Sequence, residues 1–213
     1  MPGDLQTAGY VYRYDSAGRL EEVERDRVVT ASYSYDANGN RLAKTTPEGT
    51  DTGTYDAQDR MTSYGAASFT YTANGELLAR VDPEGTTGYD YDVLGNLRSV
   101  SLPDGTAIEY LVDARHRRIG RKVDGTLERG WLWASQLAPA AELDAAGQVT
   151  SRYVHATRVN APDLILRDGA TYRLLTDPLG SPRLAVDTTT GAVVQRMDYD
   201  EWGGVQLDTN PGW

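Results

Sequence analysis

Ser181 and His155, with an aspartate, are the residues whose types could form a nucleophilic triad in this chain. In such a triad the histidine takes the serine proton and a carboxylate orients the histidine ring. Ser181 does not lie in a Gly-x-Ser-x-Gly elbow, and no helical pattern follows it. No nucleophile–base pair or carboxylate pair has a spacing that supports catalysis. The sequence therefore predicts no catalytic residue and a protein that is not an enzyme.

Aspartates recur along the chain and could suggest an array of calcium sites. Calcium-binding solenoids place several carboxylate and carbonyl ligands in every short turn, whereas here each interval supplies one aspartate. The chain has no cysteine and 2 histidines, which excludes disulfides, thiol catalysis and thiolate metal sites. We therefore expect no metal and no cofactor, and we expect the aspartates to cap turns.

His116 lies in a basic run, Ala114-Arg115-His116-Arg117-Arg118, that could hold a phosphate or an acidic partner. The whole chain has 21 basic and 31 acidic residues and a formal net charge of -10. In so acidic a chain we expect the run to pair with carboxylates on neighbouring hairpins. The charge has the wrong sign for nucleic-acid binding, so no nucleic-acid partner is expected.

The elements that position these residues are set by a repeat. One phrase, Tyr-Asp-x-x-Gly followed by Arg or Asn and Leu, recurs with variations that begin at Tyr14, Tyr35, Tyr55, Tyr71 and Tyr91. The steps between these tyrosines are 21, 20, 16 and 20 residues. A degenerate copy contains Asp113, another runs from Leu143 to Gly147, and a last one begins at Tyr199. Internal repeats of this length are typical of arrays in which each unit packs on its neighbours.

Each repeat is predicted to be a β-hairpin. An aspartate at the first turn position supplies a side-chain acceptor, and a glycine at the fourth tolerates positive φ. The predicted structural turn residues are Asp15, Gly18, Asp36, Gly39, Asp56, Gly75, Asp92, Gly95, Asp177, Gly180, Asp200 and Gly203. A second set of turns, such as Pro47-Glu48-Gly49, returns the chain to the next hairpin.

Aromatic residues flank these turns with a period of two, which places the rings on one face of a strand. The predicted strand-face aromatics are Tyr12, Tyr14, Tyr33, Tyr35, Tyr71, Tyr89 and Tyr91. Hairpins that pair edge to edge give a wide twisted sheet, and such a sheet tends to curl. The predicted fold is therefore all-β, with repeated antiparallel hairpins in a curved or spiral sheet. The stretch from Leu111 to Asp144 interrupts the rhythm, and its Trp131-Leu132-Trp133 run could form a plug, a lid or a packed strand.

The repeated phrase resembles the YD repeat of Rhs (rearrangement hot spot) proteins, of the C component of insecticidal toxin complexes, and of teneurins. The later phrases Thr176-Asp177-Pro178-Leu179-Gly180-Ser181 and Tyr199-Asp200-Glu201-Trp202-Gly203 resemble the start of the Rhs-associated core. Pro178 departs from that pattern, because the family commonly has histidine there. The resemblance implies YD-repeat hairpins over 1–125 and the start of the core over 126–213, both within a partial YD-repeat shell.

In that family the repeats form a hollow shell around a C-terminal toxin, which is released by self-cleavage. The resemblance thus implies a non-catalytic shell segment that encloses and helps to deliver a toxin. Its partners would be a downstream toxin domain and the remaining shell repeats. Asp177-Pro178-Leu179-Gly180 looks like the family's cleavage motif but is expected to be a turn. The family's cleavage site and toxin domain are expected to lie beyond Trp213.

An alternative is an extracellular module that binds carbohydrate or protein. Repeat modules that bind choline or sugar also use aromatic hairpins, but they place a tryptophan in each unit, and the tyrosine-bearing repeats here contain none. No membrane-length apolar window occurs, and Met1 to Tyr10 shows no secretion signal. We therefore expect no membrane span, and export through dedicated machinery. Unpaired sheet edges also predict edge-to-edge self-association.

Overall fold

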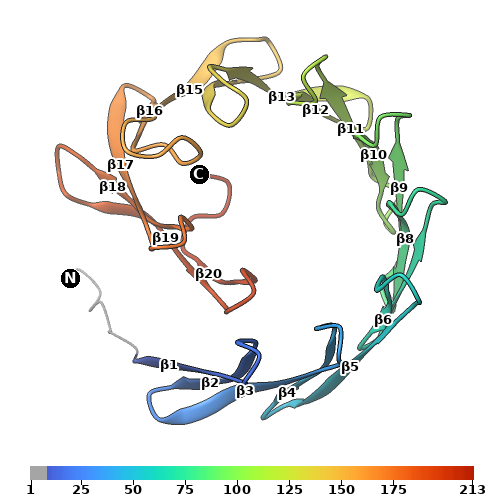
Figure 1. The fold of residues 1–213 in the computed structure, drawn as a ribbon. Helices are drawn as coiled ribbons and strands as arrows, with labels where there is room; N and C mark the ends of the chain where they lie inside the picture. Colours follow the sequence, from blue (N-terminus) through green and yellow to red (C-terminus); the bar gives the residue numbers. More distant parts are fainter. Residues whose placement is uncertain (1–8) are drawn as a thin grey trace. The chain divides into compact units, whose positions relative to one another are not determined.

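The computed structural model describes residues 9–213. The prediction that Met1 to Tyr10 holds no secretion signal concerns mostly residues 1–8, which lie outside the described residues. The described chain consists of twenty β-strands joined by turns, and none of it is helical (Figure 1). Every strand pairing for which a register is known is antiparallel. The predicted all-β class and its antiparallel hairpins are confirmed.

The chain divides into two compact units, residues 1–89 and residues 90–213, and the boundary falls inside a strand. The strands of the first unit are β1 (Tyr10–Tyr14), β2 (Leu20–Arg25), β3 (Val28–Tyr35), β4 (Arg41–Thr46), β5 (Gly49–Tyr55), β6 (Met61–Tyr64), β7 (Ala67–Tyr71), β8 (Leu77–Asp82) and most of β9 (Gly85–Tyr91). From β1 to β9, consecutive strands of the chain pair with each other.

The second unit repeats this arrangement. Its strands are β10 (Leu97–Ser101), β11 (Ala107–Val112), β12 (Arg118–Val123), β13 (Thr126–Trp133), β14 (Pro139–Leu143), β15 (Val149–Val154), β16 (Leu164–Arg167), β17 (Ala170–Thr176), β18 (Pro182–Asp187), β19 (Val193–Tyr199) and β20 (Val205–Asp208). They also pair in chain order.

Because consecutive strands are antiparallel, their connections alternate between the two ends of the strands. In each unit one end, which we call the aspartate edge, carries the turns that contain the repeat aspartates and three connections, 72–76, 134–138 and 156–163, that take the place of such a turn. These turns are 15–19, 36–40, 56–60 and 72–76 in the first unit and 92–96, 113–117, 134–138, 156–163, 177–181 and 200–204 in the second. The other end, the return edge, carries the remaining connections.

The strand pairs that are joined at the return edge share one register. In each pair, one strand follows an aspartate-edge turn and the other leads to the next such turn. The residue seven positions after the first residue of the earlier turn faces the residue four positions before the first residue of the later turn. Glu22 faces Ser32 and Ala43 faces Thr52 in the first unit, and Gly120 faces Gly130 in the second. The same spacing holds for Ser63–Ser68, Ala79–Gly88, Ser99–Glu109, Ala141–Arg152 and Leu184–Arg196. One register rule therefore specifies most of the fold.

The stretch from Leu111 to Asp144 follows the same rhythm. Strands β12, β13 and β14 continue the sheet of the second unit, and Trp131 to Trp133 form the end of β13. The turn after Trp133 begins at Ala134, 21 residues after Asp113, and so takes the place of an aspartate turn. The run is a strand of the sheet, not a plug or lid.

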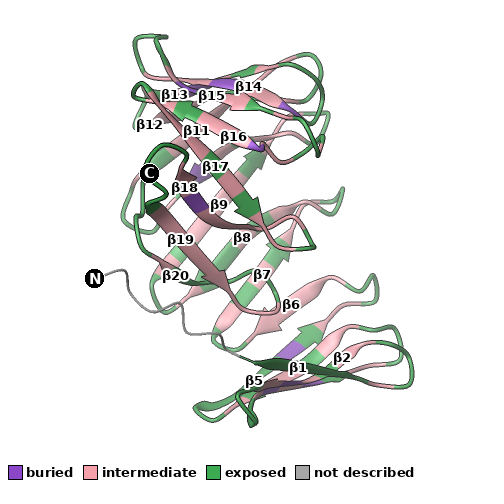
Figure 2. Ribbon diagram, turned by 90° about the vertical axis from the view of Figure 1, so that its left-hand side faces the viewer, coloured by how far each residue is buried: buried purple, intermediate pink, exposed green. Residues whose placement is uncertain are grey.

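Few residues are fully buried, and most strand positions in each unit keep some exposure to solvent (Figure 2). The first unit has a small cluster of Val23, Ala31 and Tyr33, against which Leu20 and Tyr35 pack. In the second unit the buried apolar residues are Val100, Ala141 and Ala185, which lie on three different strands, and Ala138 in the turn before β14. With so little core, hydrogen bonds and side-chain stacking between strands must supply much of the order.

Candidate functional site

The turns that begin with a repeat aspartate share a hydrogen-bonded frame. In turn 15–19 the Asp15 N–H donates to the Arg19 carbonyl at 2.9 Å, and the Gly18 N–H donates to the Asp15 carbonyl at 3.0 Å. The Asp15 side chain accepts from the N–H groups of Ala17 and Arg19, both at 2.9 Å. The turns that begin at Asp36, Asp56, Asp92, Asp113, Asp177 and Asp200 repeat this pattern. Each aspartate therefore satisfies amides of its own turn.

The fourth position of these turns has a left-handed backbone. Gly18, Gly39 and Gly95 have φ of 77°, 92° and 78°. Turn 56–60 has Asp59 at this position with φ 59°, and turn 113–117 has His116 with φ 61°. Gly18, Gly39 and Gly95 thus lie where positive φ is needed. Aspartate takes the place of glycine in one turn and histidine in another.

Hydrogen bonds lower the pKa of the turn aspartates Asp36, Asp56 and Asp113. The side-chain bond from Asn40 is the largest influence on Asp36, and that from Arg60 is the largest on Asp56. The Arg117 guanidinium, which donates to Asp113 at 2.6 Å, lowers the pKa of that carboxyl to about 2. These carboxylates are ionised near neutral pH, and their partners are groups of the fold.

An aromatic clamp joins several of these turns to the turn before them. The Tyr35 hydroxyl donates to the Leu20 carbonyl at 2.7 Å, and Leu20 lies five residues after Asp15. Tyr55 donates in the same way to the Arg41 carbonyl at 2.9 Å, and Tyr71 to the Met61 carbonyl at 2.7 Å. Burial raises the pKa of the Tyr35 and Tyr55 hydroxyls, which keeps them protonated as donors.

In the second unit other residue types supply this clamp. The Trp133 indole N–H donates to the Arg118 carbonyl at 2.9 Å, and Arg118 lies five residues after Asp113. His155 Nε2 donates at 2.9 Å to the Pro139 carbonyl, five residues after Ala134. The ring of His155 is therefore engaged with backbone. The sequence analysis missed both clamps. The spacing could have revealed them, because Ala134 lies 21 residues after Asp113 and Ala156 lies 22 residues after Ala134, close to the length of the repeat.

Arginines connect the turn carboxylates to these rings. Arg19 Nε donates to the Asp15 carboxylate at 2.7 Å, and its guanidinium lies 4.9 Å from the Tyr35 ring centre. Arg60 joins Asp56 to Tyr71 in the same way, Arg117 joins Asp113 to Trp133, and Arg183 joins Asp177 to Tyr199. We call these contacts the Asp–Arg–aromatic links. Each combines an ion pair with a cation–π contact across adjacent turns.

The predicted strand-face aromatics differ in exposure. Tyr33 is 6% exposed, and Tyr35, Tyr71, Tyr89 and Tyr91 are partly buried. Tyr12 and Tyr14, on the first described strand, are 45% and 60% exposed. The rings are thus buried where an earlier strand covers them, and exposed on β1.

The basic run around His116 is dispersed over separate contacts. Arg117 binds Asp113, Arg118 lies 4.2 Å from the Tyr110 ring centre, and Arg121 pairs with Glu128 at 2.6 Å. His116 Nδ1 lies 3.0 Å from the Asn96 side-chain oxygen on the preceding aspartate-edge turn. The carboxylate that Arg117 binds belongs to its own turn, so the expected pairing with a neighbouring hairpin is wrong for this residue, and the described contacts of the run do not converge on a single anion site.

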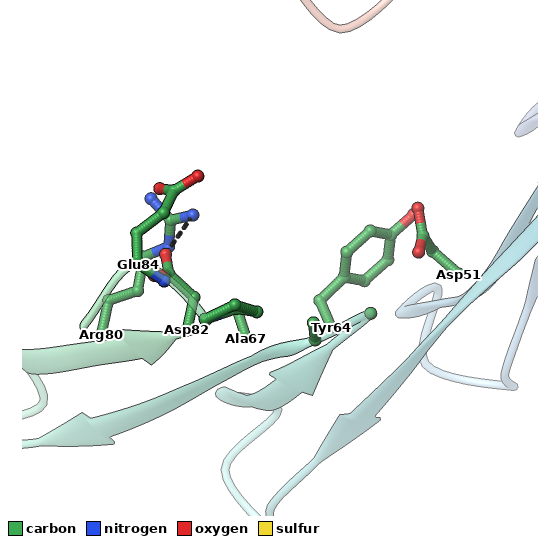
Figure 3. Close-up of a pocket in the computed structure, with 9 residues that line it drawn as sticks. Asp51, Tyr64, Ala67, Arg80, Asp82 and Glu84 are labelled. Atoms are coloured by element: carbon green, nitrogen blue, oxygen red, sulfur yellow. Dashed lines mark hydrogen bonds and ion pairs between the residues drawn. The ribbon is translucent and has the colours of Figure 1, made fainter. Parts of the chain in front are cut away.

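A cavity of about 270 Å³ opens at the return edge of the first unit (Figure 3). It arises because the β6–β7 hairpin belongs to the 16-residue repeat and is shorter than its neighbours. Asp51 and the buried Tyr64 hydroxyl lie on one side, and Arg80 and Asp82, paired at 2.6 Å, lie on the other. The described residues that line it include no serine, cysteine or histidine.

A second cavity, of about 210 Å³, lies beside the loop 156–163. Asp163 is 7% exposed and accepts hydrogen bonds from the Ala156 and Thr157 N–H groups at 2.7 and 2.8 Å. The Thr157 side chain and these amides lower its pKa to about 2. Asp163 therefore holds the loop closed, as the turn aspartates do elsewhere.

Among the described residues no cluster of three metal-ligating side chains and no helix able to cross a membrane is found.

The family model of the teneurin YD shell matches residues 4–213. The chain belongs to the teneurin YD-shell family. Teneurin-4 of Mus musculus is 27% identical over 218 residues, and teneurin-1 of Gallus gallus is 27% identical over 219 residues. The alignments cover 97% and 98% of this chain but 8% of each relative, so the chain spans about one-twelfth of the length of these teneurins.

The solved structures with similarity to this YD-shell chain include the following two. A crystal structure of TcdB2–TccC3 without its hypervariable C-terminal region has a TM-score of 0.41 and 11% identity, covering 93% of this chain and 17% of that chain. A structure of the Photorhabdus luminescens Tc holotoxin pore has a TM-score of 0.35 and 13% identity, covering 93% of this chain and 14% of that chain.

Proposed function

We propose that this chain is a non-catalytic structural segment of a YD-repeat shell. The observation that carries the proposal is the shared register of the return-edge strand pairs, which recurs in both units and is joined by aromatic clamps and Asp–Arg–aromatic links. Contacts of this kind connect neighbouring hairpins and leave the turn carboxylates engaged with their own amides and arginines. Such an arrangement of contacts resists deformation, as the wall of a shell must. The membership of this chain in the teneurin YD-shell family supports the same role.

We further propose that the wall encloses and helps to deliver a toxin domain of the full-length protein, together with other shell repeats. On this proposal the protein is exported, and residues 1–125 and 126–213 form YD-repeat and core parts of one shell. The predicted turn aspartates, turn glycines and strand-face tyrosines would then act structurally.

Protease protection tests the enclosure. The native polypeptide that contains this segment is treated with a nonspecific protease, with and without Asp113→Ala and Trp133→Ala, which break links inside the wall. We expect any domain after the shell to survive in the parent and to be digested in the variant. Equal digestion of that domain in both proteins would contradict enclosure.

The exposed aromatics favour a second candidate, an extracellular module that binds carbohydrate or protein. Tyr10, Tyr12 and Tyr14 of β1 and Trp202 of the last aspartate-edge turn are 48%, 45%, 60% and 50% exposed. Aromatic faces of this kind bind sugars and protein surfaces. Binding on a glycan array that is lost on Trp202→Ala or Tyr12→Ala would support this function, and silence across the array would argue against its carbohydrate form.

A further inference from the structure

The loop 156–163 differs from the other aspartate-edge turns of the described chain, because it is longer than they are and is closed from within. One oxygen of the Asp163 carboxylate accepts the Ala156 and Thr157 N–H groups, and the other accepts the Thr157 hydroxyl at 2.6 Å. The Asp163 N–H also donates to the Val154 carbonyl at 2.7 Å. Asp163 is therefore engaged with the loop itself, which holds a defined shape beside its cavity.

Two arginines from different elements line the cavity of about 210 Å³ beside this loop. Arg158 belongs to the loop, and Arg173 lies on β17, where it faces Leu164 of β16. The Arg173 guanidinium is 3.6 Å from the Asp163 carboxylate, and its side chain is 49% exposed. A further anionic group can therefore reach Arg173 from the cavity.

Arg158 differs from the arginines of the Asp–Arg–aromatic links. In those links the guanidinium binds a turn carboxylate at distances from 2.6 to 3.2 Å. Arg158 instead donates to the Asp177 backbone carbonyl at 3.4 and 3.5 Å, and the Asp177 carboxylate is bound by Arg183. Within residues 9–213 Arg158 forms no ion pair. This partly buried cation therefore has only long contacts to a backbone oxygen, which leaves its charge poorly compensated.

The charges that line the cavity favour a ligand with a single negative charge. Arg158 and Arg173 supply two positive charges and Asp163 supplies one negative charge, so one positive charge is left over. Guanidinium groups bind carboxylates and phosphates through charge-assisted hydrogen bonds. A carboxylate carries one negative charge, whereas a phosphate at neutral pH carries more than one. A carboxylate is therefore the oxyanion that balances this site.

We propose that the cavity beside loop 156–163 binds one carboxylate group between Arg158 and Arg173. This carboxylate takes the part that a turn aspartate plays for the arginine of an Asp–Arg–aromatic link. A small free acid or an acidic side chain of a bound protein segment can supply the group. The inference rests on one loop and its cavity, so its failure would leave the proposed role in a shell untouched.

Titration of the 213-residue chain with sodium acetate tests the site. Nitrogen–proton correlation NMR at about pH 7 and constant ionic strength follows the amide signals of residues 156–163 and 173–176. We expect saturable shifts of these signals with a dissociation constant of about 1–10 mM. Sulfate, which carries two charges, should bind no more tightly than acetate. The absence of saturable shifts, or tighter binding of sulfate, would contradict the proposal.

Variants of the two arginines test their part in binding. Arg158→Gln and Arg173→Gln should each weaken acetate binding about ten-fold or more, because each removes a charge-assisted hydrogen bond. The matched control is Arg152→Gln, since Arg152 is exposed on β15 and does not line the cavity. It makes the same change of charge and should leave binding unchanged. Circular dichroism checks that all three variants fold, and equal weakening by the three would show nonspecific attraction and overturn the site.

A second pair of ligands identifies the source of the carboxylate and needs no variant. N-acetylglutamate α-amide presents its carboxylate as a protein side chain does, and N-acetylglutamine amide is its neutral counterpart. Both sources require that the glutamate compound binds and the glutamine compound does not. Tighter binding of the glutamate compound than of acetate supports a protein side chain as the ligand, and equal binding supports a free acid. Binding of the glutamine compound as tight as that of the glutamate compound would refute a carboxylate site.

Discussion

The turn aspartates Asp15 and Asp36 both cap their turns and anchor an arginine or asparagine. The Asp15 carboxylate accepts two backbone N–H groups and the Arg19 side chain, and Asp36 accepts the equivalent groups with Asn40. A calcium ion would need these same oxygens, which are already hydrogen-bonded. The carboxylates therefore contribute to stability in their ionised form.

Acid should weaken the chain through these carboxylates. The pKa of Asp113 in the folded protein is about 2, below its ordinary value of 3.8. Because the folded value is the lower one, the stability that this group contributes is present above about pH 4 and is lost as the pH falls towards 2. In urea unfolding, Asp113→Asn should lower the midpoint at about pH 6 and have less effect near pH 2. A deficit of the same size at both pH values would contradict this account of Asp113.

A turn glycine should be intolerant of a side chain for backbone reasons alone. Gly39 has φ 92°, and a Cβ built on it meets no atom within 4 Å. Gly39→Ala should lower the free energy of unfolding by about 1–2 kcal/mol, because L-residues with a Cβ disfavour this conformation. Ser16→Ala, in an exposed turn position, is the control, with an expected change below about 0.5 kcal/mol. Equal effects of the two substitutions on urea unfolding would argue against backbone strain at Gly39.

At the scale of the strands, the clamps add side-chain hydrogen bonds to the backbone pairing of neighbouring strands. The Tyr35 hydroxyl bonds the backbone of β2, and the ring packs on the small cluster of Val23, Ala31 and Tyr33. Few residues are buried around it, so each bond between strands carries more of the stability than it would in a thick core. The clamp is thus a feature of the element and not only of the residue.

Removal of one hydroxyl tests the clamp. Tyr35→Phe should lower the free energy of unfolding by about 1 kcal/mol, because the Leu20 carbonyl loses its side-chain donor. Tyr14→Phe is the matched control, since Tyr14 occupies the same repeat position but is 60% exposed, and it should change little. Chemical denaturation of both variants measures the difference. A Tyr14→Phe loss as large as that of Tyr35→Phe would contradict the clamp.

The hairpins could be predicted from sequence because their signals are local. Asp and Gly at fixed turn positions and tyrosines two apart mark a turn and a strand face without knowledge of partners. The clamps of Trp133 and His155 could not be predicted in this way, since the residues that replace tyrosine and aspartate there, Trp133-Ala134 and His155-Ala156, share only their spacing with the repeat. The arginine links were also missed, because a stack between adjacent turns depends on the register of two strands.

At the scale of the whole molecule, stability should be distributed as it is in repeat proteins. Pairings run in chain order through each unit, so a hairpin interacts chiefly with the hairpins beside it. Gly39→Ala should therefore raise amide hydrogen exchange in β2 to β5 and leave residues 90–213 unchanged. Faster exchange throughout the chain would indicate a single cooperative unit and contradict this expectation.

The proposed role of this YD-shell chain as a wall is tested most directly by cryo-electron microscopy of the native polypeptide that contains these residues. We expect the twenty strands to line a cavity, with density for an enclosed domain inside it and with the register seen here. Strands that enclose no volume, with both faces open to solvent or occupied by a ligand, would contradict the shell role and favour a binding module.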